Sequence, residues 1–531
     1  MASSTSPSHS PNSCRYDSIP DSNTFPHIES SSLSSLPSPI AKPTTRLLAP
    51  DLQRGLLMAV MALDHVALGL NTWRHGTNVD GEMDGIIVRR WNFTTAYIVR
   101  TLTHLCAPGF TFLLGMGVVF LSQSRTRLGW STGRLMRYYA MRGFILTAVT
   151  ALMGFVGTGG QVWFVNVVLF ALAMDYVLAG MLWLLIDRTE KWFATILERC
   201  LLSKDKCAVA VYDAGDDDVD DEEGGISQPL LVGQRHAARA SERAASASLS
   251  SWHTHNILLV ILSVVTIWWN IWLSDNHGHC SIETELLDNS ASTRFIPSSR
   301  HPLLGIWFWF VESEHVMSNF PPMAWLSFAI LGLLYGRILS ARKWTTSAIT
   351  IGHVSAGIIF STIFVLTRLL RLGNLSEDCL HTPAQHHQTA TENPYLASPA
   401  SFFYIVKYPP DVAFWAFTMA GNLFLLAAFS SIPTHLAKRF TLLLDFGASS
   451  LFFYVVHLSI VMSPLGTLLK KTFGEDSGHP DSTNPGSTLG ITNLFAYFAL
   501  WSVLLLIMWP ACYYYSRFKS TRHVDSLWRF F

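Results

Sequence analysis

Charge is scarce in this sequence. Charged residues make up only 14% of the 531 positions, and 37 Lys+Arg are balanced by 37 Asp+Glu. With no net charge, the composition points neither to a nucleic-acid partner nor to an acidic substrate. Half of the residues are hydrophobic, and the mean hydropathy of +0.29 is too apolar for an ordinary soluble domain. The composition therefore predicts an integral membrane protein that binds no nucleic acid.

Cysteine is also sparse. The chain has seven cysteines, and none of them forms a C-x-x-C pair. A structural zinc site or a redox dithiol needs such spacing, so neither is expected and no metal is predicted. Residues 1–45 are rich in Ser and Pro and lack the apolar core of a cleavable signal. We expect residues 1–45 to form a disordered cytosolic tail.

Long apolar runs dominate the rest of the chain. Crossing the hydrocarbon core of a membrane takes about 20 apolar residues, and ten runs meet this requirement. They lie at residues 52–72, 104–122, 138–157, 162–186, 256–273, 320–339, 347–367, 410–430, 440–463 and 491–512. The stretch 302–311 is apolar but too short to cross, so it is expected to be re-entrant or interfacial. The predicted fold is an all-α, polytopic transmembrane bundle of about ten helices.

The polar segments divide the chain into parts. Residues 187–254 contain an acidic run followed by an Ala/Ser/Arg stretch, which is typical of a disordered cytosolic linker. The predicted parts are the tail 1–45, four helices in 46–186, the linker 187–254, six helices in 255–515 and a C-terminal tail at 516–531. Basic residues follow the second, sixth, eighth and tenth runs, which places both termini in the cytosol. We expect a multi-pass protein of an endomembrane or the plasma membrane.

Asparagines and cysteines in the predicted outer loops, on the side opposite the cytosol, agree with this topology. The N-x-[ST] triplets at Asn92 and Asn374 are candidate glycosylation sites. Cys280 and Cys379 also fall in outer loops, and an oxidising lumen would let them pair. From the sequence alone, a disulfide and two free thiols are equally compatible with this placement.

Ionisable residues within the predicted spans are the strongest functional signal. Each costs about 2.5–3.5 kcal/mol to insert, so it needs a partner or a purpose. The five sites are the pair Asp64 and His65, then His104, Asp175, Asp411 and His457. All except Asp175 fall toward the outer side of separate helices, an arrangement that can build a polar cavity. Adjacent residues on a helix point about 100° apart, so Asp411 or an outer-loop Glu is an alternative partner for His65.

The first predicted helix resembles that of known membrane acyltransferases. The segment TRLLAPDLQRGLLMAVMALDH, which starts at Thr45, has an Arg, then Asp-x-x-Arg-Gly, then an apolar run that ends in a histidine. The heparan-α-glucosaminide N-acetyltransferase-like family and the bacterial O-acetylase type share this pattern. The matching positions are Arg46, Asp51, Arg54, Gly55 and His65.

Further blocks are similar to the less characterised branch of the N-acetyltransferase-like family. They are THLCAPGFTFLLGMG (103–117), FPPMAWLSFAILGLLYG (320–336), VKYPPDVAF (406–414) and LLLDFGASSLFFYVVHL (442–458). The resemblance implies transfer of an acyl group from acyl-CoA, with acetyl-CoA as the first choice. The acceptor would be a hydroxyl or amine of a sugar, a lipid or a small metabolite.

Roles for individual residues follow from the resemblance together with the ionisable pattern. The expected catalytic residues are His65 as general base, Asp64 to orient it, and His104. His104 stays an alternative base, because the lysosomal acetyltransferase has its proposed catalytic histidine in the loop after the first helix. The expected substrate-binding residues are Arg54, Asp51, Lys407, Asp411, His457 and Glu312. Attack is expected directly on the thioester, with Cys106 as the alternative nucleophile.

Two other classes of protein fit the same pattern. Buried Asp and His residues also serve as proton relays, which a proton-coupled transporter would need, although no inverted repeat supports one. A non-catalytic membrane protein that keeps the fold is the third reading. The expected partners are the lipid bilayer, acyl-CoA and an unidentified acceptor, and the sequence leaves a homodimer open.

Overall fold

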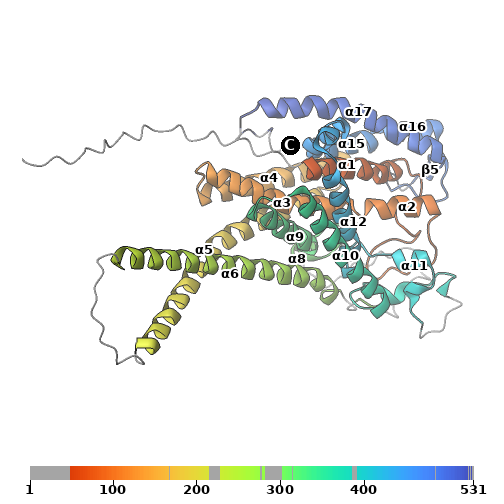
Figure 1. Ribbon diagram of the computed structural model, residues 1–531. Coiled ribbons are helices and arrows are strands. Elements are labelled where there is room, and N and C mark those ends of the chain that lie inside the picture. The colour runs from red at the N-terminus through yellow and green to blue at the C-terminus, as the bar shows by residue number, and fades with distance from the viewer. Residues whose placement is uncertain are drawn as a thin grey trace, which may run out of the picture. The chain divides into compact units, whose positions relative to one another are not determined.

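The described part of the chain is mostly helical, as the sequence predicts (Figure 1). The computed structural model describes residues 48–166, 168–213, 228–274, 278–280, 302–313, 315–385, 392–482, 484, 486–523, 526 and 528. The predicted tail at 1–45 and the acidic residues 214–227 lie outside the described residues. The predictions made for those two segments therefore stay predictions.

Membrane-crossing helices account for most of the described chain. Eight helices in this part are long and apolar enough to span a membrane, or nine if the bent pair α14 and α15 counts as one span. The eight are α2 (Thr94–Thr103) with α3 (Cys106–Arg127), α4 (Thr132–Gly157), α5 (Leu169–Asp213), α6 (Gln228–Trp272), α9 (Pro322–Ala341), α10 (Thr346–Leu370), α12 (Val412–Ser431) and α17 (Leu494–Thr521). The protein is therefore a multi-pass membrane protein.

The first predicted span is the helix α1 (Leu48–Gly69), which has 22 residues. It carries Asp51, Arg54 and Asp64, so its uncharged run is shorter than those of the other helices. Most of its residues are nevertheless buried, because α1 packs against α3, α12, α14, α15 and α17 (Figure 1). Charged residues on such a helix must face other parts of the protein rather than lipid.

Short elements connect the spans. The short helices are α8 (Pro302–Phe308), α11 (Pro399–Phe403), α13 (Thr434–Ala437), α14 (Thr441–Ala448), α15 (Ser450–Val461) and α16 (Pro464–Phe473). In the first sheet, β3 (Val316–Ser318) lies between β1 (Phe164–Asn166), which runs parallel to it, and β2 (Val311–Glu312), which runs antiparallel. In the second, β4 (Glu475–Asp476) pairs antiparallel with β5 (Leu489–Gly490). At seven residues, α8 is too short to cross a membrane, as expected for 302–311.

The boundaries around the predicted linker need correction. Residues 164–166 form β1, so the fourth span begins at Leu169 rather than at residue 162. Helix α5 then continues to Asp213 and α6 begins at Gln228, so much of 187–254 is helical. Residues 187–213 contain no Gly or Pro and are rich in good helix formers, which outweighs their polarity. Helix α17 likewise extends to Thr521, into the predicted C-terminal tail.

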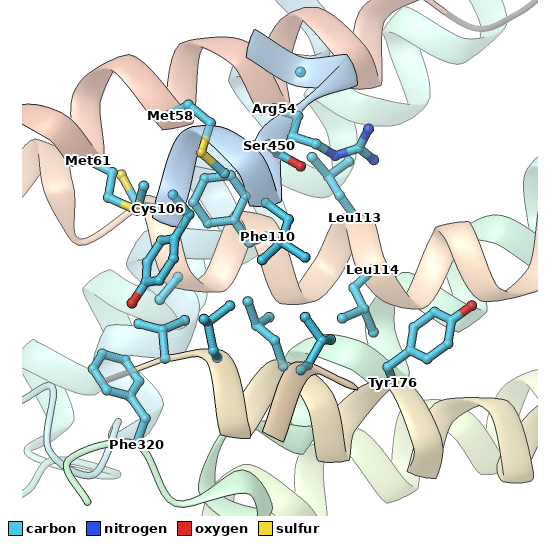
Figure 2. A pocket seen from close by; sticks show the side chains of 18 of the residues that line it. Arg54, Met58, Met61, Cys106, Phe110, Leu113, Leu114, Tyr176, Phe320 and Ser450 are labelled. Atoms are coloured by element: carbon cyan, nitrogen blue, oxygen red, sulfur yellow. The ribbon is translucent and has the colours of Figure 1, made fainter. Parts of the chain in front are cut away.

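Two glycines bring α1 and α14 into backbone contact. A Cβ atom on Gly55 would lie 1.9 Å from the Leu443 carbonyl oxygen, and one on Gly447 would lie 2.2 Å from that of Asp51. Any larger residue at either position would force the two helices apart. Just beyond this contact, the chain bends by 92° between α14 and α15, and Ser450 at the start of α15 lines the same pocket as Arg54 (Figure 2). The Arg-Gly pair of α1 therefore sits at a broken helix.

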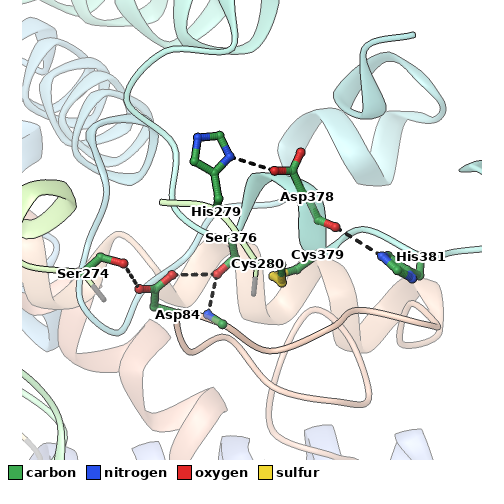
Figure 3. Close-up of a disulfide and its surroundings, with 9 residues drawn as sticks. Asp84, Ser274, His279, Cys280, Ser376, Asp378, Cys379 and His381 are labelled. Carbon is green, nitrogen blue, oxygen red and sulfur yellow. Dashed lines mark hydrogen bonds and ion pairs between the residues drawn. A yellow bond between two sulfur atoms is a disulfide. The ribbon is translucent and has the colours of Figure 1, made fainter. Parts of the chain in front are cut away.

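A disulfide links the loops that follow α6 and α10. The sequence left this pairing open, and the structure confirms that Cys280 and Cys379 are joined (Figure 3). The Cys379 carbonyl accepts a hydrogen bond from the Val88 N–H at 2.8 Å. The Asp84 carboxylate accepts hydrogen bonds from the hydroxyls of Ser274 at 2.6 Å and Ser376 at 2.9 Å. The two linked loops therefore hold the segment 70–93 between α1 and α2.

One predicted glycosylation site is wrong. The Asn374 side chain is buried, its amide donates to the Thr367 carbonyl, and its oxygen accepts from Arg368 at 2.7 Å. A glycan needs an exposed amide nitrogen, so Asn374 is a packing residue instead. Asn92 is half-buried and donates to the Arg74 carbonyl, and its glycosylation stays a prediction.

Breaking the disulfide is expected to destabilise the protein. The bond closes a loop of 99 residues, and removing such a cross-link typically costs about 2–4 kcal/mol. We expect the double variant Cys280→Ser with Cys379→Ser to unfold at a lower temperature, as measured by thermal unfolding of the purified protein. Cys200→Ser, at an exposed free cysteine, serves as the control. Equal unfolding temperatures for the double variant and the wild type would contradict the prediction.

Candidate active site

A cavity of about 390 Å³ lies between α1, α3, α4, α5 and the α14–α15 break. One face of α1 lines it, because Arg54, Met58, Met61, His65 and Leu68 recur every three or four residues. At 1.5 Å of rise per residue, Arg54 and His65 lie about 16 Å apart along the helix. The cavity thus extends over three turns of α1 and has the volume of a small-molecule site.

The cavity is lined by both cationic and apolar side chains. Four cationic residues line it, namely Arg54, Arg142, Lys407 and Lys519. The Arg142 guanidinium lies 4.4 Å from the centre of the Tyr176 ring. The apolar side chains of the middle part include Met58, Met61, Cys106, Phe110, Leu113 and Leu114. A ligand with an anionic head and a slender, less polar arm would match this lining.

At the other end, His65 is fixed by a second histidine. His65 Nδ1 lies 2.7 Å from His457 Nε2, and His457 Nδ1 lies 2.7 Å from the carbonyl oxygen of Phe453. A carbonyl oxygen can only accept, so His457 Nδ1 must carry a proton. His457 has no carboxylate partner among the described residues and is fully buried, which favours its neutral form. Its Nε2 is then an acceptor.

This chain of acceptors and donors determines the tautomer of His65. Because His457 Nε2 accepts, His65 Nδ1 must donate its proton to it. The other ring nitrogen, His65 Nε2, then carries a lone pair, on a side chain that lines the cavity. His457 itself does not line the cavity but lies behind His65. His65 therefore has the protonation state that a general base requires.

Asp64 belongs to a different cluster. The Arg100 guanidinium, from α2, donates to Asp64 at 2.6 Å and to Glu82 through two nitrogens at 2.6 and 2.9 Å. His104 Nε2 lies 3.2 Å from the same Glu82 oxygen. Arg100 and Glu82 are almost completely buried, so the shared arginine offsets part of the cost of burying the two carboxylates. Within the described residues, Asp64 makes no hydrogen bond to His65.

The loop between α1 and α2 supplies two members of this cluster. Burial would raise the pKa of Glu82, but Arg100 and then His104 hold it well below its usual value, so Glu82 is ionised. Arg100 also donates to His75 Nε2 at 2.9 Å. Burial, followed by the charge of Arg100, lowers the pKa of His75 to about 4, so His75 is neutral at physiological pH. His75 lines the cavity, whereas His104 does not.

The structure corrects three of the expected roles. Neither Asp64 nor Asp411 orients His65, because His457 occupies that position. The Asp411 carboxylate instead caps the N-terminus of α12, accepting from the Phe414 N–H at 2.6 Å and from the Leu375 N–H at 3.2 Å. His104 holds Glu82 behind the cavity, so His65 is the better candidate for the base.

The remaining predicted residues lie in varied positions. Lys407 lines the cavity and is buried. Asp51 accepts a hydrogen bond from Arg54 at 3.0 Å and so supports that side chain. Glu312 lies in β2, and its side chain is outside the described part of the structure. The Cys106 thiol lines the cavity but donates to the Leu57 carbonyl at 3.4 Å rather than to a base.

Asp175 stands apart from the cavity. It is fully buried in α5, and neither carboxylate oxygen has a hydrogen-bond partner among the described residues. It does not line the cavity. Asp175 therefore contributes nothing visible to the candidate active site.

Fold and site together define a multi-pass helical membrane protein with a cavity that ends at a histidine pair. Among the described residues, no group of three or more His, Cys, Asp or Glu is placed to hold a metal ion. No protein-family model matches the chain, and no curated protein matches it.

Proposed function

We propose that this protein is a membrane-embedded acyltransferase that moves an acetyl or other acyl group from acyl-CoA to a hydroxyl or amine. The observation that carries the proposal is the His457–His65 pair, which leaves a lone-pair nitrogen of His65 on a cavity-lining side chain. The resemblance of α1 to membrane acyltransferases of the heparan-α-glucosaminide N-acetyltransferase-like type supports the same activity. The acceptor would be a sugar, a lipid or a small metabolite.

In the proposed reaction, His65 acts as general base. Its Nε2 takes the proton of the acceptor group as that group attacks the thioester carbonyl carbon. It then returns the proton to the departing CoA thiolate. His457 keeps the imidazole in the required tautomer and accepts the hydrogen bond from Nδ1 throughout.

The cationic residues would hold the donor. Arginine and lysine side chains bind phosphate groups, and Arg54 and Lys519 lie in the part of the chain that we expect to face the cytosol, where CoA is found. The apolar middle of the cavity would then receive the pantetheine arm. The disulfide between Cys280 and Cys379 supports an oxidising compartment on the opposite side. Both termini would thus be cytosolic.

The relay predicts a defined effect of changing His457. His457→Phe keeps a planar ring but removes the acceptor for His65 Nδ1, so the tautomer is no longer determined. We expect kcat to fall by about 10-fold or more, with KM for acetyl-CoA nearly unchanged. Steady-state kinetics of the purified variant would check this, and an unchanged kcat would show that His457 only packs against His65.

Transfer of a labelled acetyl group tests the function itself. The purified full chain, reconstituted in lipid vesicles, would be given acetyl-CoA labelled in the acetyl group and a panel of amino sugars, polyols and lipids. Label should pass to at least one acceptor class or, in their absence, slowly to water. A wild-type protein that leaves acetyl-CoA intact under all these conditions would contradict the proposal.

A proton-coupled transporter is the second candidate. The 92° break between α14 and α15 borders the cavity, and broken helices form substrate sites in many transporters. A transporter would move protons across vesicles without consuming acyl-CoA. Proton flux that does not depend on acyl-CoA, together with intact acyl-CoA, would favour it over the acyltransferase.

A further inference from the structure

Lys407 places a buried ammonium group in the lining of the cavity. The residue is only 6% exposed, yet its side chain lines the cavity. Its Nζ makes no hydrogen bond or ion pair with any residue that the structure describes. The groups around it are aromatic, with Nζ 5.5 Å from the centre of the Phe320 ring and 5.3 Å from that of Tyr408.

The backbone holds Lys407 firmly at the His65 end of the cavity. The N–H groups of Lys407 and Tyr408 both lie 3.3 Å from the Glu82 carbonyl oxygen, to which they donate. Glu82 is itself held by Arg100 through its side chain. The segment that carries Lys407 is therefore anchored to the same loop as the Arg100 cluster.

Lys407 balances the charge of the buried cluster without its side chain forming a hydrogen bond within it. Arg100 makes direct hydrogen bonds to both buried carboxylates, Asp64 and Glu82. Lys407 is close enough to act on Asp64 and His65 electrostatically, but among the described residues its side chain makes no hydrogen bond or ion pair with either of them. A buried ammonium group whose N–H groups have no acceptor is costly, unless the site is built to receive an acceptor that carries negative charge.

We infer that Lys407 stabilises the oxyanion that forms during acyl transfer. This inference rests on the proposed function. As the acceptor oxygen or nitrogen bonds to the thioester carbon, the carbonyl π electrons move to oxygen, and His65 takes the acceptor proton. The Lys407 ammonium interacts with this negative oxygen. When the carbonyl re-forms, the C–S bond breaks and the thiolate takes the proton from His65. Electrostatic groups placed in advance in this way contribute more than any other single factor in many enzymes.

Separate measurement of kcat and KM in a Lys407 variant tests this role. Lys407→Met keeps the length and the apolar stem but removes the charge. We expect kcat to fall by about 100- to 1000-fold, with KM for acetyl-CoA and for the acceptor within about two-fold of wild type. If Lys407 instead binds an anionic group of the acceptor, KM for the acceptor would rise while kcat stayed near wild type, and the inference would be overturned.

Chemical rescue provides a second measurement. In Lys407→Ala, added methylammonium should restore part of kcat, because it can bind where the ammonium was. Lys471→Met, at an exposed lysine, is the control and should keep wild-type kinetics. Unfolding temperatures would show that each variant folds. Turnover that depends on His65 but is unchanged in both Lys407 variants would overturn this inference alone, whereas a wild type without turnover would overturn the proposed function with it.

Discussion

Replacing His65 with asparagine is expected to reduce the rate of acyl transfer by about 100- to 10,000-fold. General-base catalysis contributes a factor of this size, and asparagine cannot take a proton at neutral pH. Asparagine can still donate to His457 Nε2, so the side chain keeps a partner and the fold should persist. KM for acetyl-CoA should change little, because Arg54, which would bind the nucleotide, lies about 16 Å away along α1.

The matched control is another buried histidine in a span. His353, in α10, lies 2.5 Å from the Tyr335 hydroxyl and does not line the cavity. His353→Asn should leave kcat within a few-fold of wild type. Initial rates with labelled acetyl-CoA would compare the two variants. An equal fall in kcat in both variants would show that activity depends on having a buried histidine there for packing and not on base catalysis by His65.

Arg100→Gln is expected to have the largest effect on stability. It leaves Asp64 and Glu82 buried without their shared cation, and breaking a buried ion pair costs about 3–5 kcal/mol. The loop that carries Glu82 also holds Lys407 and Tyr408 by backbone hydrogen bonds, so the cavity should lose its shape. We expect a marked fall in folded yield and in unfolding temperature, measured on protein extracted from membranes.

A double variant tests the cause of this loss. Glu82→Gln removes one of the two uncompensated charges, so Arg100→Gln with Glu82→Gln should be more stable than Arg100→Gln alone. A surface pair serves for comparison, since Lys191 and Asp187 are largely exposed and Lys191→Gln should change stability by less than about 1 kcal/mol. A double variant that is less stable than Arg100→Gln would argue against charge as the cause.

Hydropathy predicted the spans well, because each segment that crosses the lipid must itself be a long apolar helix. His65 was also found by a local argument, since an ionisable residue in an apolar helix is costly wherever it occurs. The partner of His65 was not found. His457 lies 392 residues away, and its role depends on the packing of α15 against α1, which no sequence period reveals.

Arg100 was missed for a specific reason. The apolar run that predicts the second span, 104–122, starts after Arg100, so hydropathy places Arg100 outside the span. In the structure the helix begins at Thr94, and the candidate span runs from there to Arg127. An earlier boundary would have made Arg100 a buried cation and therefore a costly residue in need of a partner. Glu82 had no such signal, because a glutamate in a loop is usually solvated.

The central claim is that the cavity holds acyl-CoA with its acyl group at His65. The most direct measurement is a cryo-electron microscopy map of the full chain with a thioether analogue of acetyl-CoA, which cannot transfer its acyl group. We predict density through the cavity, with the nucleotide near Arg54 and Lys519 and the carbonyl oxygen near His65 and Lys407. A cavity that stays empty at saturating analogue, or a nucleotide bound at the His65 end, would contradict the account.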